Sequence, residues 1–180
     1  SDTAVYISTD ILIHICLYIS ELGVDFSLVV EKEQRQLTGL QNNGGIEEIR
    51  SVLMCILEKC RICAAENKLT ATKKKVNDAV DFIDSNYSRI DMSLNLVADT
   101  IGVNASYLSN IFKKEKGCSL SKYLTQTRLE QAKKYLTEYP DKTLIEIAES
   151  IGYSDVYYFS KNFKKYYGIS PSKYQEERKM

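Results

Sequence analysis

The C-terminal half of the chain contains one segment twice, and this repeat limits the folds that the chain can adopt. The stretch from Ser93 to Tyr123 returns, at many positions with the same residue type, as the stretch from Thr143 to Tyr174. Four matched pairs keep an offset of 50 residues, before one inserted residue changes the offset to 51: Leu94/Leu144, Ala98/Ala148, Ile101/Ile151 and Gly102/Gly152. A repeated unit performs one structural task twice, so the fold must contain the same supersecondary unit in two copies.

Each copy has the pattern of a helix-turn-helix unit. A hydroxyl residue, Ser93 or Thr143, can cap the first helix, and Glu146 follows Thr143 at the spacing of a capping box. Gly102 and Gly152 supply the positive φ that ends this helix and begins a tight turn. The pattern therefore predicts two short helices that end at equivalent glycines.

The second helix of each copy is predicted to expose a polar stripe. Asn104 and Ser154 are expected to cap these helices, and one continuous helical pattern from Ser121 to Glu138 joins the two copies. The apolar positions of each helix face inward, and residues at spacings of three and four form the opposite, exposed stripe. The stripe consists of Ser106, Ser109, Asn110 and Lys113 in the first copy and of Tyr157, Ser160, Lys161 and Lys164 in the second. Neither set contains a carboxylate, which phosphates would repel. Short polar side chains and lysine suit base edges, whereas Lys114, Lys116 and Lys165 lie at the helix ends, where phosphates are closer.

Charge divides the chain into two parts. Residues 1–72 carry 6 Lys and Arg against 10 Asp and Glu, while residues 73–180 carry 18 against 14. This asymmetry favours a basic nucleic-acid module joined to an acidic partner region. Helices are predicted at 8–22 and 46–66, with a polar linker and domain boundary at 67–75. We therefore expect an acidic, mainly helical regulatory or dimerisation segment at 1–72, part of a larger domain, and a DNA-binding domain at 73–180.

The cysteines and apolar runs limit the other classes of protein. Five cysteines without framework spacing favour reduced thiols and a cytoplasmic location. Cys60 and Cys63 lie on an apolar helical face, so buried thiols are favoured over a metal site. The longest apolar run, at 11–19, is about half of a membrane span, which predicts no membrane contact. No catalytic, metal-binding or cofactor-binding arrangement is predicted. The chain begins without Met, so we expect an excised fragment whose upstream sensor or receiver domain is absent.

The residues from about 75 to 175 resemble the AraC/XylS family of bacterial transcription regulators. The segment FSKNFKKYYGISPSKY, from Phe159 to Tyr174, is similar to the family's C-terminal signature almost throughout. The resemblance implies an all-α fold, in which a seven-helix domain holds two helix-turn-helix units on a linker helix and follows a small helical N-terminal region. It also implies that the two recognition helices enter successive major grooves of double-stranded DNA, about 34 Å apart.

The resemblance, together with the polar stripes, gives a set of DNA-binding candidates. They are Ser106, Tyr107, Ser109, Asn110, Lys113, Lys114, Val156, Tyr157, Tyr158, Ser160, Lys161, Lys164 and Lys165. Arg128 matches a recurrent Arg of the family, with either a structural or a phosphate-binding role. Gln175 departs from the family, many of whose members have Tyr-Arg where this chain has Tyr174-Gln175. The arrangement further resembles the response-regulator-like and membrane-sensor-like branch of the family.

These observations predict a sequence-specific, DNA-binding transcription regulator without enzymatic activity; activation and repression are both compatible with them. One alternative is an alkylation-repair methyltransferase fragment, in which a zinc-held cysteine accepts a methyl group from DNA. Another is a helical protein-interaction module, in which residues 1–72 could also form a homodimer.

Overall fold

The computed structural model describes residues 14, 17–18 and 46–177. The chain separates into two compact units, Ser1–Thr72 and Lys73–Met180. Residues 14, 17 and 18 are helical, and the rest of the helix predicted at 8–22 lies outside the described residues. Among the described residues, no helix has the length and apolar character needed to cross a membrane.

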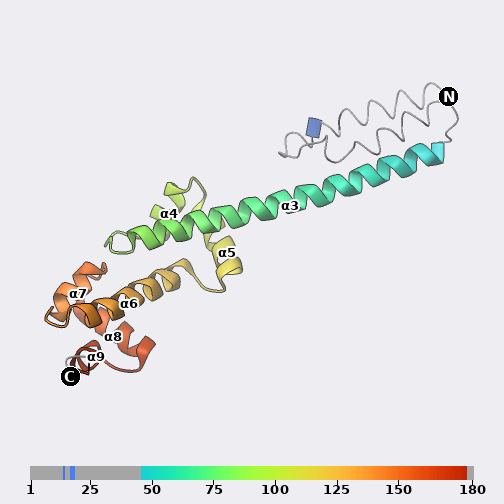
Figure 1. Cartoon of the computed structure of the whole chain (residues 1–180). Helices are drawn as coiled ribbons and strands as arrows, with labels where there is room; N and C mark the ends of the chain where they lie inside the picture. The colour runs from blue at the N-terminus through green and yellow to red at the C-terminus, as the bar shows by residue number, and fades with distance from the viewer. Residues whose placement is uncertain (1–13, 15–16, 19–45, 178–180) are drawn as a thin grey trace. The chain divides into compact units, whose positions relative to one another are not determined.

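Residues 46–177 form seven helices and no strand, which confirms the all-α prediction for this part of the chain. The helices are α3 (Ile46–Asn86), α4 (Leu94–Thr100), α5 (Ala105–Lys116), α6 (Leu120–Glu138), α7 (Leu144–Ser150), α8 (Val156–Tyr167) and α9 (Pro171–Glu176) (Figure 1). The part of α3 from Lys73 onward belongs to the second unit together with the other six helices.

The predicted linker at 67–75 is wrong, because these residues continue α3 without a break. The segment is polar, yet it contains no Gly or Pro, and its Lys and Ala residues are good helix formers. The hydroxyls of Thr70 and Thr72 donate to the carbonyls of Glu66 and Lys68, at 2.9 and 2.8 Å, and so are satisfied within the helix. The polar composition of this segment was therefore not sufficient evidence for a linker.

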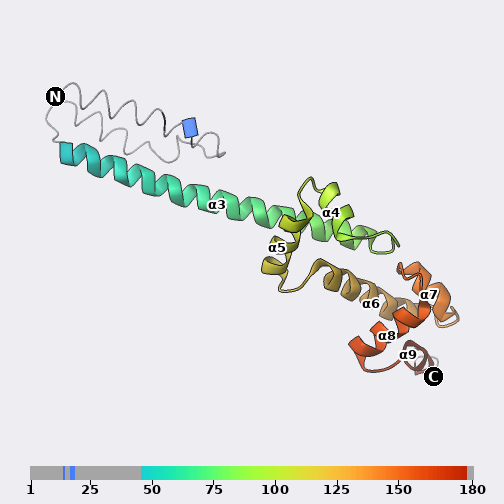
Figure 2. The same ribbon diagram turned by 180° about the vertical axis from the view of Figure 1, so that it is seen from behind.

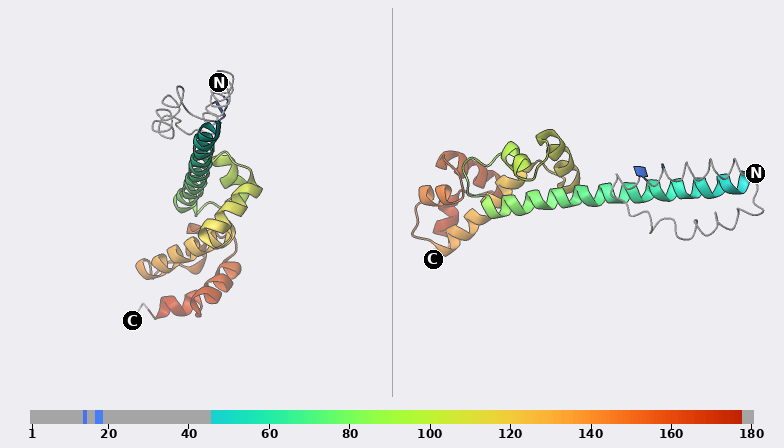
Figure 3. Two further views of the ribbon diagram at one scale, coloured as in Figure 1. Left: turned by 90° about the vertical axis from the view of Figure 1, so that its right-hand side faces the viewer. Right: turned by 90° about the horizontal axis from the view of Figure 1, so that it is seen from above.

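The second unit is built around two hydrophobic cores that share α6. In the first lobe, α3 from Lys73 onward, α4, α5 and the start of α6 enclose one core, to which α6 contributes Leu120 and Leu124. In the second lobe, the rest of α6 and helices α7, α8 and α9 enclose the other, to which α6 contributes Leu129, Ala132 and Leu136. Figures 1 and 2 show α6 running from α5 at one end to α7, α8 and α9 at the other, and Figure 3 shows the same order. The two helix-turn-helix units are thus carried by one shared helix.

The turns follow the predicted chemistry. Ser93 caps α4 by accepting a hydrogen bond from the Leu96 amide at 3.2 Å. Thr143 caps α7 in a complete capping box with Glu146. The turns after these helices place Gly102 at φ +67° and Gly152 at φ +85°, in the left-handed region that favours glycine. These predictions are confirmed.

Candidate nucleic-acid interface

The first candidate recognition helix, α5, begins at the predicted cap. The side-chain oxygen of Asn104 accepts hydrogen bonds from the amides of Ser106 and Tyr107, at 2.8 and 3.4 Å. Leu108 and Phe112 are fully buried and fix the inner face of the helix. The opposite face is therefore turned toward solvent.

The second candidate recognition helix, α8, is capped one residue later than predicted. Asp155 rather than Ser154 is the cap, and its Oδ1 accepts from the amides of Tyr157 and Tyr158 at 2.7 and 3.3 Å. The inserted residue that changes the repeat offset from 50 to 51 shifts the cap by one position. Sequence reasoning missed this exposed carboxylate at the helix start, although Asp directly before the helical pattern was the available signal.

The structure places the predicted site residues on the outer faces of α5 and α8. Most of them are exposed: Ser106, Tyr107, Asn110, Lys113, Lys114, Tyr157, Tyr158, Lys161, Lys164 and Lys165. Ser109, Val156 and Ser160 are half-buried. Before its last turn, α5 exposes the short polar residues Ser106 and Asn110, whereas α8 exposes Tyr157, Tyr158 and Lys161. Both helices carry exposed lysines in the last turn, so the predicted residues form two separate surfaces, one on each helix.

The tyrosines of α8 differ in their surroundings. Tyr157 is 84% exposed, whereas Tyr158 is 58% exposed and its ring centre lies 6.0 Å from that of buried Tyr153. Tyr167 is half-buried, with its hydroxyl donating to the Leu129 carbonyl at 3.4 Å. Burial raises the pKa of Tyr167 to about 12. Tyr157 is therefore the aromatic side chain of this helix that is most open to a ligand.

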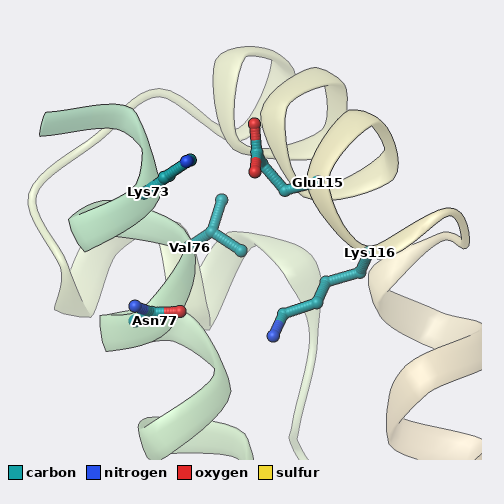
Figure 4. Close-up of a pocket in the computed structure, with 5 residues that line it drawn as sticks. All are labelled: Lys73, Val76, Asn77, Glu115 and Lys116. Atoms are coloured by element: carbon teal, nitrogen blue, oxygen red, sulfur yellow. The ribbon is translucent and has the colours of Figure 1, made fainter. Parts of the chain in front are cut away.

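Lys116 differs from the other lysines at the end of α5. It lines a small open pocket together with Glu115 of the same helix and Lys73, Val76 and Asn77 of α3, and its side chain turns back toward α3 (Figure 4). The pocket combines two ammonium groups with one carboxylate and one amide, so its charges partly offset one another. Lys113 and Lys114, in contrast, lie outside the lining of this pocket.

Arg128 makes internal contacts from the middle of α6. Its Nε donates to the Tyr87 carbonyl at 2.8 Å and its Nη2 donates to the Arg89 carbonyl at 2.7 Å. Its guanidinium carbon lies 5.5 Å from the centre of the Tyr153 ring. Burial lowers the pKa of Arg128 below its ordinary value. Of the two roles that the sequence left open, these contacts support the structural one.

Comparison with known proteins identifies the family. Residues 97–177 match the model of a helix-turn-helix domain. This chain is similar to the C-terminal domain of AraT, a response regulator from Geobacillus stearothermophilus: the TM-score is 0.56 and the identity 38%, over 58% of this chain and 85% of that one. A transcriptional regulator with an AraC-type DNA-binding domain from Chromobacterium violaceum aligns with a TM-score of 0.54 and 25% identity, over 61% of this chain and 96% of that one. This chain belongs to the AraC/XylS family.

Sequence relatives agree with this assignment to the AraC/XylS family. The Msm operon regulatory protein of Streptococcus mutans is 31% identical over 158 residues, which are 88% of this chain and 56% of that protein. The probable transcription factor PqrA of Proteus vulgaris is 32% identical over 58% of this chain and 86% of its own length. The bifunctional transcriptional activator and DNA repair enzyme AdaA of Bacillus subtilis is 31% identical over 67% of this chain and 56% of its own length. The chain thus spans little more than half of the Msm regulator.

Gln175, the departure from the family signature, has a packing role. Its Nε2 donates to the carbonyls of Pro140 and Lys142, at 2.9 and 2.8 Å, and so ties α9 to the connection between α6 and α7. In the sequence, this position is distinguished only because many family members have an arginine there. The amide that replaces it satisfies two backbone carbonyls instead.

Proposed function

We propose that this AraC/XylS family chain is a sequence-specific transcription regulator that binds double-stranded DNA by inserting α5 and α8 into two successive major grooves. The observation that carries the proposal is the pair of matched outer faces, polar and basic, on two helices held by the same helix α6. A major groove admits one α-helix, and two grooves on one face of the duplex are about 34 Å apart.

The outer face of α5 suits direct contact with bases. The exposed amide of Asn110 can bond the N6 and N7 atoms of adenine, while Ser106 and Ser109 can donate to or accept from either base of a pair. Because α5 brings no Arg to this face, its contacts should discriminate less strongly than a bidentate pair to guanine.

The outer face of α8 suits contacts with other bases. Lys161 can reach O6 and N7 of guanine, and the apolar parts of Val156 and Tyr157 can pack on thymine methyl groups. The two recognition helices should therefore prefer different base sequences, so that the whole site is not a simple repeat.

The lysines at the helix ends supply binding that is independent of base sequence. Lys113 and Lys114 of α5, and Lys164 and Lys165 of α8, are exposed, and each can neutralise a phosphate. Counterions released from the phosphates make such binding fall steeply as salt rises. Base contacts then add specificity to this general affinity.

We expect residues 1–72 to belong to a regulatory region that could form a homodimer, an upstream sensor or receiver domain to control it, and a cytoplasmic location. We also expect no enzymatic activity. A methyl acceptor held by zinc needs several converging cysteines, and no cluster of potential metal ligands is found among the described residues.

Selection from a random duplex pool tests this function. The full chain, the double variant Asn110→Ala, Lys161→Ala and the control Lys68→Ala, an exposed lysine of the first unit, are compared at two salt concentrations. We expect wild type and control to enrich two short boxes about one helical turn apart, and the double variant to lose them. Salt-sensitive binding without enrichment, equal in all three proteins, would refute sequence-specific reading.

A further inference from the structure

Arg128 lies where α6 passes from one hydrophobic core to the other. Leu124 is part of the first core and Leu129 is part of the second, so Arg128 occupies the crossing between the two lobes. Each lobe carries one recognition helix, α5 in the first and α8 in the second. The geometry at this crossing therefore governs how the two recognition helices are separated.

The side chain of Arg128 contacts both lobes. On the side of the first lobe, it donates to the carbonyls of Tyr87 and Arg89 in the connection between α3 and α4. This connection is anchored in the first core by Met92, and Tyr87 packs against both cores. Figure 1 shows the connection after α3 close to the helices of the second lobe.

On the side of the second lobe, Arg128 contacts the turn of the helix-turn-helix unit. Its guanidinium lies over the ring of Tyr153, whose centre is 5.6 Å from that of Phe159 in α8. A Cβ atom at Gly152 would lie 2.8 Å from Nη2 of Arg128 and 2.7 Å from the Ser88 carbonyl oxygen. The backbone of this turn therefore lies directly against the arginine and the connection that the arginine holds.

We infer that Arg128 is a positioning residue that fixes the separation and rotation of α5 relative to α8, and thereby the spacing between the two DNA boxes that the protein accepts. The inference rests on the proposed function. Inserting one base pair between the boxes moves the second box by about 3.4 Å along the duplex and turns it by roughly 35°. A junction clamped by two charge-assisted hydrogen bonds and a stacked ring cannot follow this movement without breaking contacts.

The first test measures spacing preference on DNA. Duplexes carrying both boxes at spacings from two base pairs shorter to two longer than the selected one, and a duplex with a single box, are titrated with the full chain. The variants are Arg128→Ala, Arg128→Met, which keeps an unbranched apolar side chain but has no donors, and Arg128→Lys, which keeps a cationic donor. The control is Lys133→Ala on the same helix, which removes a cation 5.3 Å from the Tyr167 ring within the second lobe.

Wild type and Lys133→Ala should discriminate against a one-base-pair insertion by roughly tenfold or more, because a displaced box costs at least one base contact. Arg128→Ala and Arg128→Met should accept all spacings within about threefold of one another and bind the single-box duplex like wild type, with Arg128→Lys between these limits. A wild-type spacing preference in Arg128→Met would overturn the inference. Failure of both Ala and Met variants to fold would also overturn it, since Arg128 would then serve folding rather than positioning.

The second test needs no DNA, so it separates this inference from the proposed function. Residual dipolar couplings of amides in α4 and α5 and in α7 and α8 report whether the two lobes tumble as one body. We expect one alignment tensor for both lobes in wild type and Lys133→Ala, and two different tensors in Arg128→Met. A common tensor in Arg128→Met would refute the positioning role, whatever DNA the protein binds.

Discussion

Replacing Gly152 with Ala should destabilise the second unit more than the same change at Gly102. The two glycines occupy equivalent positions of the repeat and both have positive φ, +85° and +67°. An added Cβ at Gly102 would meet nothing within 4 Å, whereas at Gly152 it would lie 2.7 Å from the backbone oxygen of Ser88. Both variants therefore introduce backbone strain, but only Gly152→Ala also introduces a steric clash.

The expected magnitudes follow from these two effects. An L-residue in the left-handed region costs about 1–2 kcal/mol, which applies to both variants. Overpacking adds about 1–3 kcal/mol at Gly152, because the nearest atom belongs to the backbone and cannot rotate away. Gly152→Ala should therefore lose about 2–5 kcal/mol in total. For a domain of roughly 100 residues, 1 kcal/mol lowers the Tm by about 4–8 °C, so Gly152→Ala should melt at least about 4 °C below Gly102→Ala.

Thermal unfolding of the full chain, followed by near-ultraviolet circular dichroism, measures this difference. The protein has no tryptophan, and all of its 13 tyrosines except Tyr6 and Tyr18 lie in residues 73–180, so the signal reports mainly the second unit. Equal Tm values for the two variants would refute the reasoning. They would mean that the turn at Gly152 moves away from Ser88 at no cost, and that the junction around Arg128 is not tightly packed.

Two further predictions concern charge. Lys165→Ala should weaken binding to all duplexes equally and reduce the slope of log affinity against log salt by about 1. Titrations of DNA at several salt concentrations measure this slope. An unchanged slope would mean that Lys165 does not contact a phosphate. In the capping box, the Thr143 amide and hydroxyl donate to the Glu146 carboxylate at 2.7 and 2.8 Å and hold its pKa below the ordinary 4.5. The box should therefore stabilise α7 above pH 4.5, and this contribution should be lost as pH falls through the lowered pKa of Glu146 in the folded state. The urea midpoints of wild type and Glu146→Gln should accordingly differ less at about pH 3 than at pH 7. A difference in midpoint that stays constant with pH would contradict this prediction.

The elements that sequence predicted best are those whose signals are local. The capping residues Ser93, Asn104 and Thr143 and the turn glycines each depend on backbone geometry within a few residues. Comparing two copies of one unit located these signals more securely than either copy alone. The cap of α8 was wrongly predicted at Ser154 because the two copies differ in length by one residue at this point. Ser154 and Asp155 are both polar, and either can be aligned with Asn104.

The features that sequence could not predict depend on contacts between distant residues. Nothing near Arg128 in the chain indicates that it bonds carbonyls at residues 87 and 89, some 40 positions earlier. The continuation of α3 through the predicted linker was missed for the opposite reason, because a polar composition suits both an exposed helix and a loop. The outer faces of α5 and α8 were predictable, since amphipathic helices assign their exposed positions by periodicity.

Hydroxyl-radical footprinting of the full chain on its selected duplex shows how many grooves the protein occupies and on which face of the DNA. If α5 and α8 enter two successive major grooves from one side, backbone protection should appear as two short stretches on one face of the duplex, about 10 base pairs apart. Alanine at Asn110 should weaken one stretch, and alanine at Lys161 the other. A single protected stretch, or two stretches on opposite faces, would contradict the account.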